Sequence, residues 1–261
     1  VQPLAMKDGI LQFSASVLAN NYSTPNDLSF RLTAKGDIEA VPAIKYMEKK
    51  GYKKMAILSM TNEIGTSLTD SLVRSAEGTG VTVVAKETFS PDVVDFRTQL
   101  SKIKVTGPDV IYLASLASHS AQIMKQAKEL GIRAVYMSYR AAEDPALIKN
   151  APDLASQLVY TNAFDDKVNT PEVQTFVKTW NEKYPNEVPT AYAAEAYQSV
   201  LFMAEVFGLC GKDYACIQQK LNEFKNHPSV FGPLSFDENG DVMYDFFFKT
   251  IKDRKFVRLE E

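Results

Sequence analysis

The chain has 261 residues, of which 45% are hydrophobic and 23% charged, which is enough apolar material for one large core or two small ones. Its formal net charge of −3, with Lys and Arg interspersed among Asp and Glu, argues against nucleic acid as a partner. No apolar run reaches the roughly 18 residues that a transmembrane helix needs. No secretory signal is present, so a secreted protein would have to be in processed or trimmed form.

From residue 53 the sequence alternates between apolar strands and amphipathic helices, the order typical of a parallel sheet covered on both faces. Strands are predicted over 53–60, 81–89, 109–115 and 134–138. Helices are predicted over 64–77, from 95 to the break at 107–108, and from 118 to 131. A strand over 9–14 and a helix over 38–50 add one unit at the front. This order predicts a doubly wound α/β lobe.

The second half of the chain follows a different order. Helices are predicted over 173–184, 191–208 and 215–224, and strands between 231 and 259 around the turn Asp237–Asp241. These helices need a sheet of their own, so we predict an α/β protein with two lobes. Residues 1–7 resemble the tail of a helix with no strand before it, so we expect roughly 80 to 100 residues to precede Val1 in a complete relative. The first lobe would then be incomplete here.

Cys210 and Cys216 flank a short polar loop between two predicted helices. This spacing suits a local disulfide in an oxidising compartment, and two reduced thiols are the alternative. The two histidines, His119 and His227, lie far in the sequence from each other and from the cysteines. Zinc needs more ligands close together, so we expect neither a metal site nor any other cofactor.

Six strings carry a resemblance to a known family: residues 9–16 (GILQFSAS), 30–33 (FRLT), 95–104 (DFRTQLSKIK), 108–112 (PDVIY), 123–132 (IMKQAKELGI) and 231–241 (FGPLSFDENGD). In this order, over essentially the whole chain, the sequence resembles the type I periplasmic binding proteins. The similarity is to the branched-chain amino acid (Leu/Ile/Val)-binding family of ABC importers. The first strands and helices of that family are absent from this sequence.

The resemblance implies two Rossmann-like lobes with parallel sheets, joined by three crossovers. The first lobe would comprise residues 1–34 and 165–248, and the second lobe 35–164 and 249–261. Hinge closure around a small solute would then produce the form that a membrane permease recognises. The resemblance also implies a periplasmic or extracellular location, and a dimer is possible because helix faces of an incomplete lobe would be uncovered.

In open parallel sheets, ligands bind beyond the carboxyl ends of the strands. After the first strand, Ser16 is a candidate ligand contact, and a simple turn serine is the alternative. The family's amino acid binders carry Ser or Thr at the position that is Leu18 here. The resemblance also makes Tyr192 an aromatic wall of the pocket. Tyr192 and Tyr197 lie on one predicted helix with apolar neighbours, so at least one of them is expected to be core.

The second lobe supplies the other candidates, after the strands that end near Met60, Ser115 and Ser138. Asn62 and Ser115 are polar candidates in the first two of these loops. The resemblance implies a ligand-facing tyrosine at two positions that are Ile64 and Leu116 here, which favours a more apolar pocket or a lobe that no longer binds.

The loop after the fourth predicted strand carries Tyr139 and Arg140. The resemblance implies that the acidic residue that pairs with the ligand ammonium falls on Arg140. A cation at this position repels an ammonium and favours a carboxylate, to which an Arg fork contributes about 1.5 to 3 kcal/mol in a sheltered cleft. An amino acid ligand is therefore disfavoured. The alternative is that Arg140 is an exposed surface arginine with no ligand role.

Catalytic motifs are absent from the sequence, so no enzyme activity is expected. Residues 61–67 (TNEIGTS) lack the first glycine and the lysine of a nucleotide-binding loop, and neither GxGxxG nor GxSxG occurs. We predict the solute-binding component of an ABC importer, for a small carboxylate or partly apolar anion. A sensory module of the same fold is the first alternative, and a truncated interaction domain without a competent site is the second.

Overall fold

The computed structural model describes residues 2–25 and 27–260. The chain divides into two compact units, each made of two stretches of sequence. Unit 1 comprises Val1–Lys35 and Ala163–Asp245, and unit 2 comprises Gly36–Asn162 and Phe246–Glu261. The chain therefore crosses between the units three times. No helix among the described residues is long and apolar enough to cross a membrane.

Unit 2 is built on a seven-stranded sheet with the order β11-β10-β7-β6-β5-β3-β4. Five neighbouring strands are parallel, while β10 pairs antiparallel with both β7 and β11. The strands are β3 (Lys54–Met60), β4 (Thr82–Phe89), β5 (Val110–Ala114), β6 (Val135–Ser138), β7 (Leu158–Asn162), β10 (Phe247–Lys252) and β11 (Lys255–Arg258). The mixed α/β architecture expected from the alternating pattern is confirmed.

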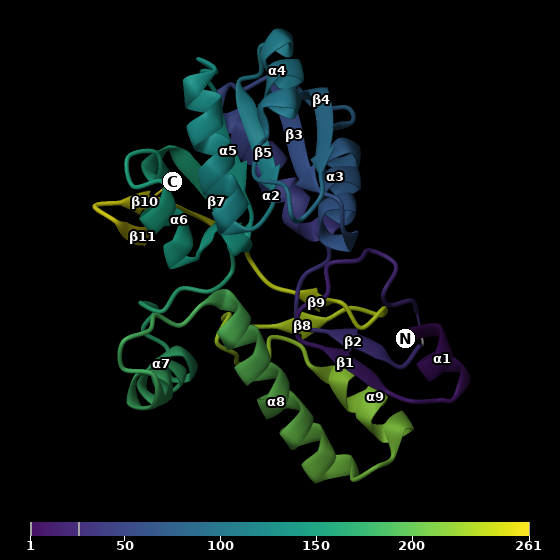
Figure 1. Cartoon of the computed structure of the whole chain (residues 1–261). Helices are drawn as coiled ribbons and strands as arrows, with labels where there is room; N and C mark the ends of the chain where they lie inside the picture. The colour runs from purple at the N-terminus through teal and green to yellow at the C-terminus, as the bar shows by residue number, and fades with distance from the viewer. Residues whose placement is uncertain (1, 26, 261) are drawn as a thin grey trace. The chain divides into compact units, whose positions relative to one another are not determined.

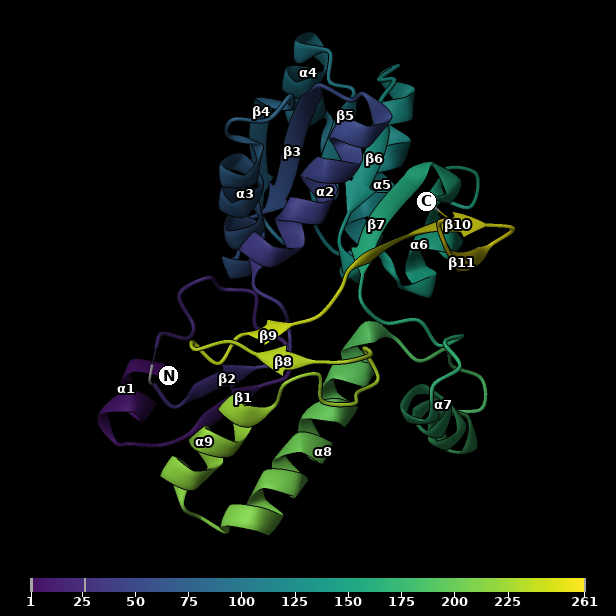
Figure 2. The same cartoon turned by 180° about the vertical axis from the view of Figure 1, so that it is seen from behind.

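Helices cover both faces of this sheet (Figures 1 and 2). On one face lie α2 (Gly36–Lys50) and α3 (Glu63–Ala76), and on the other lie α4 (Arg97–Thr106), α5 (Ala117–Glu129) and α6 (Pro145–Asn150). Successive residues of a strand point to opposite faces, and both faces of β3 and β5 are buried. These central strands are therefore continuous apolar runs, which is why the sequence predicts them well.

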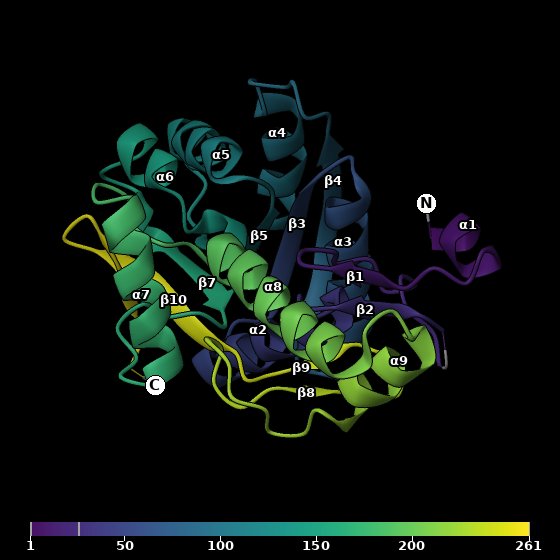
Figure 3. The same cartoon turned by 90° about the horizontal axis from the view of Figure 1, so that it is seen from below.

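Among its described residues, unit 1 contains two short sheets. The strands β1 (Gln12–Ser14) and β2 (Ser29–Arg31) pair in parallel, and β8 (Ser235–Phe236) pairs antiparallel with β9 (Val242–Met243). The helices are α1 (Gln2–Lys7), α7 (Pro171–Lys183), α8 (Ala191–Cys210) and α9 (Tyr214–Glu223). Figure 3 shows α8 and α9 side by side. Buried phenylalanine rings from strands and helices form much of the core: Phe30, Phe202, Phe224 and Phe236.

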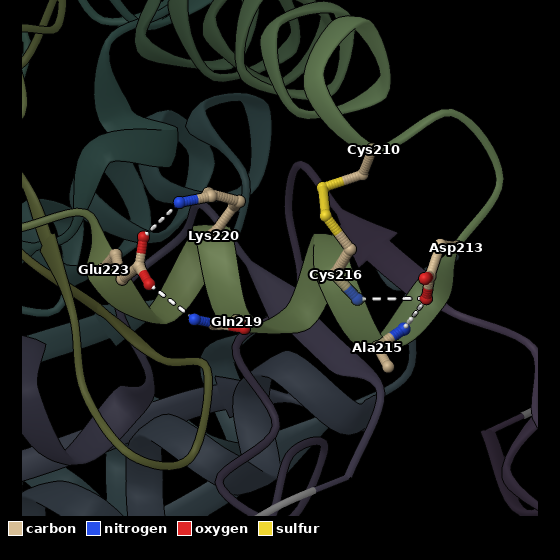
Figure 4. Close-up of a disulfide and its surroundings, with 7 residues drawn as sticks. All are labelled: Cys210, Asp213, Ala215, Cys216, Gln219, Lys220 and Glu223. Carbon is tan, nitrogen blue, oxygen red and sulfur yellow. Dashed lines mark hydrogen bonds and ion pairs between the residues drawn. A yellow bond between two sulfur atoms is a disulfide. The ribbon is translucent and has the colours of Figure 1, made fainter.

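Cys210 and Cys216 form a disulfide between the end of α8 and the first turn of α9 (Figure 4). Asp213, in the connecting loop, accepts hydrogen bonds from the backbone amides of Ala215 and Cys216 at 3.0 and 3.1 Å. This capping starts α9 just before Cys216, so that Cys216 lies in its first turn, within bonding distance of Cys210 at the end of α8. The covalent link therefore fixes the turn between these two neighbouring helices of unit 1.

A buried carboxylate joins distant parts of unit 1. Asp241 precedes the third crossover and accepts hydrogen bonds from Arg31 Nε at 2.6 Å, Lys35 Nζ at 2.8 Å and Ser23 Oγ at 2.5 Å. The side chains of Arg31 and Asp241 are 0% and 1% exposed. A charge removed this far from water requires opposite charge and hydrogen bonds, which these three donors provide.

Candidate functional site

Six of the nine predicted ligand-binding residues lie at one edge of the unit 2 sheet. The strands β3, β5 and β6 are neighbours, and each is followed closely by two of these residues. The six are Asn62, Ile64, Ser115, Leu116, Tyr139 and Arg140. Because the three strands are parallel, their carboxyl ends meet at the same edge of the sheet. The topology therefore brings the three loops together.

In the loop after β3, the side chain of Asn62 caps α3. Its Oδ1 accepts a hydrogen bond from the Gly65 backbone amide at 2.8 Å. Gly65 is needed here because a Cβ atom at this position would lie 2.0 Å from the carbonyl oxygen of Met60. The helix therefore starts in close contact with the end of the strand. Asn62 and Ile64 are both half-buried.

The loop after β5 contributes one buried and one exposed side chain. The hydroxyl of Ser115 is buried and lies 2.9 Å from the hydroxyl of Ser120, with which it shares a hydrogen bond. Leu116 precedes α5 and is 44% exposed. At this edge, the loop after β5 therefore presents the apolar side chain of Leu116 to solvent. Its serine, Ser115, is instead hydrogen-bonded to Ser120 in the first turn of α5.

The loop after β6 carries the single charged residue among the six. Tyr139 is buried, and Arg140 begins the 3₁₀ helix η1 (Arg140–Ala142). The Arg140 guanidinium is nearly buried and lies 6.0 Å from the centre of the Tyr139 ring. Its Nη1 atom donates to Glu39 Oε2 at 3.2 Å, which forms a buried ion pair between η1 and α2.

Glu39 is a partner that the sequence analysis missed. It lies in the first turn of α2, has no exposed surface, and also accepts a hydrogen bond from Thr161 Oγ1 at 2.8 Å. Burial raises the pKa of the Glu39 carboxyl, and the Arg140 guanidinium opposes that rise. One local signal was available: Glu39 shares a helix face with the buried residues Ala43 and Met47, and an acid at a core position needs a partner.

Glu143 is a second acid that the sequence analysis missed. It directly follows η1, and its carboxylate accepts hydrogen bonds from Lys249 Nζ at 2.5 Å, Asn162 Nδ2 at 2.5 Å and Tyr160 Oη at 2.9 Å. Lys249 is 2% exposed and Glu143 is 8% exposed. The segment that carries Tyr139 and Arg140 is therefore held in unit 2 at both of its ends.

The other three predicted residues belong to unit 1. Ser16 is exposed and follows β1, while Leu18 is 2% exposed and part of the apolar core. Tyr192 lies near the start of α8 and is 39% exposed. Its neighbour Tyr197 is half-buried, with its ring 4.8 Å from that of Phe176. Of the two tyrosines, Tyr197 is thus the one with more of its ring in the core.

Side chains that commonly ligate metals do not gather in the described part of the chain. Among residues 2–25 and 27–260, no group of three or more His, Cys, Asp or Glu residues is placed to hold a metal ion. His119 lies against Phe89 and Phe96, and its Nε2 atom is 3.0 Å from the carbonyl oxygen of Pro91. The Nε2 atom of His227 lies 3.2 Å from Oε1 of Glu205.

Comparisons with known proteins agree with this architecture. The model of a periplasmic binding protein family matches residues 1–255. A Leu/Ile/Val-binding protein homologue from Brucella melitensis is 24% identical over 80% of this chain and 56% of its own length. The Leu/Ile/Val-binding protein BraC3 of Rhizobium johnstonii is 22% identical over 93% of this chain and 66% of its own length. The chain thus spans less than two thirds of these relatives.

Two solved structures extend the comparison. A leucine-binding protein from Thermotoga maritima superposes with a TM-score of 0.89 at 20% identity, over 100% of this chain and 75% of that one. A solute-binding protein of an ABC transporter from R. palustris, solved in complex with benzoate, gives a TM-score of 0.85 at 18% identity, over 98% of this chain and 72% of that one. At these identities the likeness concerns the fold.

Proposed function

This chain belongs to the periplasmic binding protein family, and from that premise we propose that it is the extracytoplasmic solute-binding component of an ABC importer. Its fold is typical of the solute-binding proteins of ABC transporters, which are not enzymes. A periplasmic or extracellular location and a membrane permease as partner belong to the proposal. The disulfide between Cys210 and Cys216 supports this location, because such bonds persist in oxidising compartments.

We further propose that the solute is a small carboxylate, aromatic or aliphatic, and not an amino acid. The observation that carries this proposal is the position of Arg140, which follows β6 at the edge where β3 and β5 also end. A guanidinium group has five N–H donors in a planar fork, so it can bind a ligand carboxylate while it keeps an ion pair with a protein carboxylate. Leu116 and Ile64 supply apolar surface in the neighbouring loops.

The charge at this edge also bears on amino acid ligands. An α-ammonium group near Arg140 would meet a like charge. Glu39 partly neutralises Arg140, but its carboxylate cannot itself contact the ammonium group, because its side chain has no exposed surface. The benzoate bound to one structural neighbour is an aromatic carboxylate, so the fold accommodates this class of solute in another protein. Other neighbours are a leucine-binding protein and a protein in complex with isoleucine, so leucine is the natural counter-test.

Thermal denaturation with added solutes tests this proposal. Benzoate and a short series of aliphatic carboxylates are compared with leucine at millimolar concentration. A solute present at about 100 times its Kd stabilises the folded state by about 2.7 kcal/mol, which raises the Tm by several degrees. We expect such a rise with at least one carboxylate and none with leucine. Native mass spectrometry of the purified protein would identify a solute that is retained from the cell.

Two variants test whether a rise in Tm with a carboxylate depends on Arg140. Arg140→Lys keeps the positive charge beside Glu39 but loses the fork, so the rise in Tm with the carboxylate should fall. Arg133→Ala is the matched control, because Arg133 is exposed in the same unit. A rise in Tm with leucine that Arg140→Lys leaves unchanged would contradict the proposed solute class. Hinge closure on binding stays a prediction, which small-angle scattering with and without the solute would check.

A further inference from the structure

The three crossovers share a feature inside unit 2. The chain passes between the units after Lys35, after Asn162 and after Asp245. In unit 2, the segment beside each crossover supplies a side chain to buried hydrogen bonds: Glu39 from α2, Thr161 and Asn162 from β7, and Lys249 from β10. These bonds connect to two residues, Arg140 and Glu143, at the two ends of η1.

The first end of η1 joins two crossovers. Arg140 donates to one oxygen of Glu39 at 3.2 Å, and Thr161 donates to the other oxygen at 2.8 Å. Glu39 follows the first crossover, and Thr161 precedes the second. The carboxylate therefore bridges α2, β7 and the loop after β6. None of the three side chains is more than 6% exposed.

The other end of η1 joins the second and third crossovers. Glu143 accepts from Asn162, the last residue of β7, and from Lys249 on β10. The same two strands pair antiparallel, with Lys249 opposite Tyr160, whose hydroxyl is the third donor to Glu143. The carboxylate thus lies against the strand that precedes the second crossover, β7, and the strand that follows the third, β10.

Buried charges make this arrangement sensitive to displacement. A buried carboxylate that loses one charged partner keeps the cost of its own desolvation, so the surrounding groups tend to move with it. Glu39 has two donors and Glu143 has three in this set of bonds. A shift of η1 would therefore displace or break hydrogen bonds to α2, β7 and β10 at the same time.

We propose that the segment 139–143 transmits solute binding to all three crossovers, with Glu39 and Glu143 as positioning residues. This inference rests on the proposed function, in which Arg140 contacts the solute. A solute that moves or orders Arg140 changes the carboxylates at both ends of η1, and through them the segments that begin or end each crossover. Neither acid contacts the solute, and each acts through the segment that does.

Amide hydrogen–deuterium exchange on the ligand-free protein tests this coupling without any solute. Glu143→Gln keeps the side-chain size but removes the charge that Lys249 requires. We expect exchange to become about tenfold faster or more in 139–144, 158–162 and 246–252, because a hydrogen bond to a buried charge is lost. The decisive region is 36–44, to which Glu143 makes none of these bonds, and it should exchange faster as well. Helix α4 (97–106) should stay unchanged.

Two further variants keep the test decisive. Glu77→Gln is the matched control, because Glu77 is exposed in the same unit and should change none of these regions. Tyr160→Phe removes one hydroxyl from Glu143 and leaves the charges in place, so it should give the same pattern with a smaller effect and a folded protein. Faster exchange confined to 139–144, or spread equally to 97–106, would overturn the inference.

Exchange in the presence of benzoate separates the inference from the proposed function. In the wild type, we expect slower exchange at 139–144 and at the three crossover regions together. In Glu143→Gln, the bonds of Arg140 and Thr161 to Glu39 remain, so the slowing should persist at 139–144 and 36–44 and be lost at 246–252. Slowing at 246–252 in this variant would overturn the transmission. Should neither benzoate nor any of the aliphatic carboxylates change exchange in the wild type, the proposed solute class fails, while the ligand-free comparison still decides the coupling.

Discussion

Replacing Asp241 with Asn should destabilise unit 1 strongly. The Asp241 carboxylate accepts from Arg31, Lys35 and Ser23, and the Arg31 side chain is fully buried. Asn keeps one acceptor oxygen but turns an amide group toward donors, and it leaves Arg31 with a buried charge and no carboxylate. Breaking a buried pair from one side costs about 3 to 5 kcal/mol, so we expect the free energy of unfolding to fall by about that amount.

Urea unfolding followed by tryptophan fluorescence measures this change. Trp180 is the only tryptophan of the chain and lies on α7 in unit 1, so its signal reports on the unit that contains Asp241. Glu238→Gln is the control, because Glu238 belongs to the same turn and makes none of these bonds to Arg31. The double variant Arg31→Met with Asp241→Leu should recover much of the loss, since apolar residues can replace a buried ion pair. A loss below about 1 kcal/mol for Asp241→Asn would refute the reasoning, since an exposed ion pair contributes that much.

Three further predictions concern stability. Replacing Cys210 and Cys216 with Ser should lower the free energy of unfolding of unit 1 by about 2 kcal/mol, because the bond closes a loop with a sequence separation of 6; reduced wild type in the same urea titration should match the variant. Gly65→Ala should cost about 1 to 3 kcal/mol by thermal melting, because the added Cβ meets the Met60 carbonyl; an unchanged Tm would show that the contact relaxes freely. The pKa of Glu39 is raised on folding, so the folded state takes up a proton first as the pH falls. The stability of the wild type relative to Glu39→Gln should therefore rise from pH 7 toward the ordinary Glu value of 4.5, and a falling difference would contradict this sign.

Local pattern predicted the strands of unit 2 that belong to the regular alternation. The strand predicted over 53–60 is β3 (Lys54–Met60), and the one over 81–89 is β4 (Thr82–Phe89). The short strand β2 and the strand β7 were not predicted, because β2 has three residues and the helix between β6 and β7, α6, has only six. Pairing of β7 with β10 depends on residues far apart in the sequence, which no local window contains.

The candidate site was predictable to a different extent. The positions of Tyr139, Arg140 and Leu116 followed from the rule that loops after parallel strands meet at one edge. Their partners did not follow, because Glu39 and Arg140 are 101 residues apart in the sequence, and Glu143 and Lys249 are 106 apart. Side-chain pairing over such distances is set by the three-dimensional fold. The sequence alone therefore indicated Arg140 as a cation, and the position of Glu39 on the buried face of α2 showed that this acid needs a partner without showing which one.

The pairing of β7 with β10 also sets an order of events during synthesis. Unit 2 is interrupted in the sequence by residues 163–245, which belong to unit 1. A ribosome that has just completed β7 has made Glu143 but not its cation, Lys249, and an edge of the central sheet is still without its partner strand. Unit 2 can complete its native hydrogen bonds only after the second part of unit 1 has been synthesised, because β10 and β11 follow it in the sequence. The nascent chain thus carries an open strand edge through the translation of 83 intervening residues, 163 to 245 inclusive, and this is the interval in which a chaperone would be most needed.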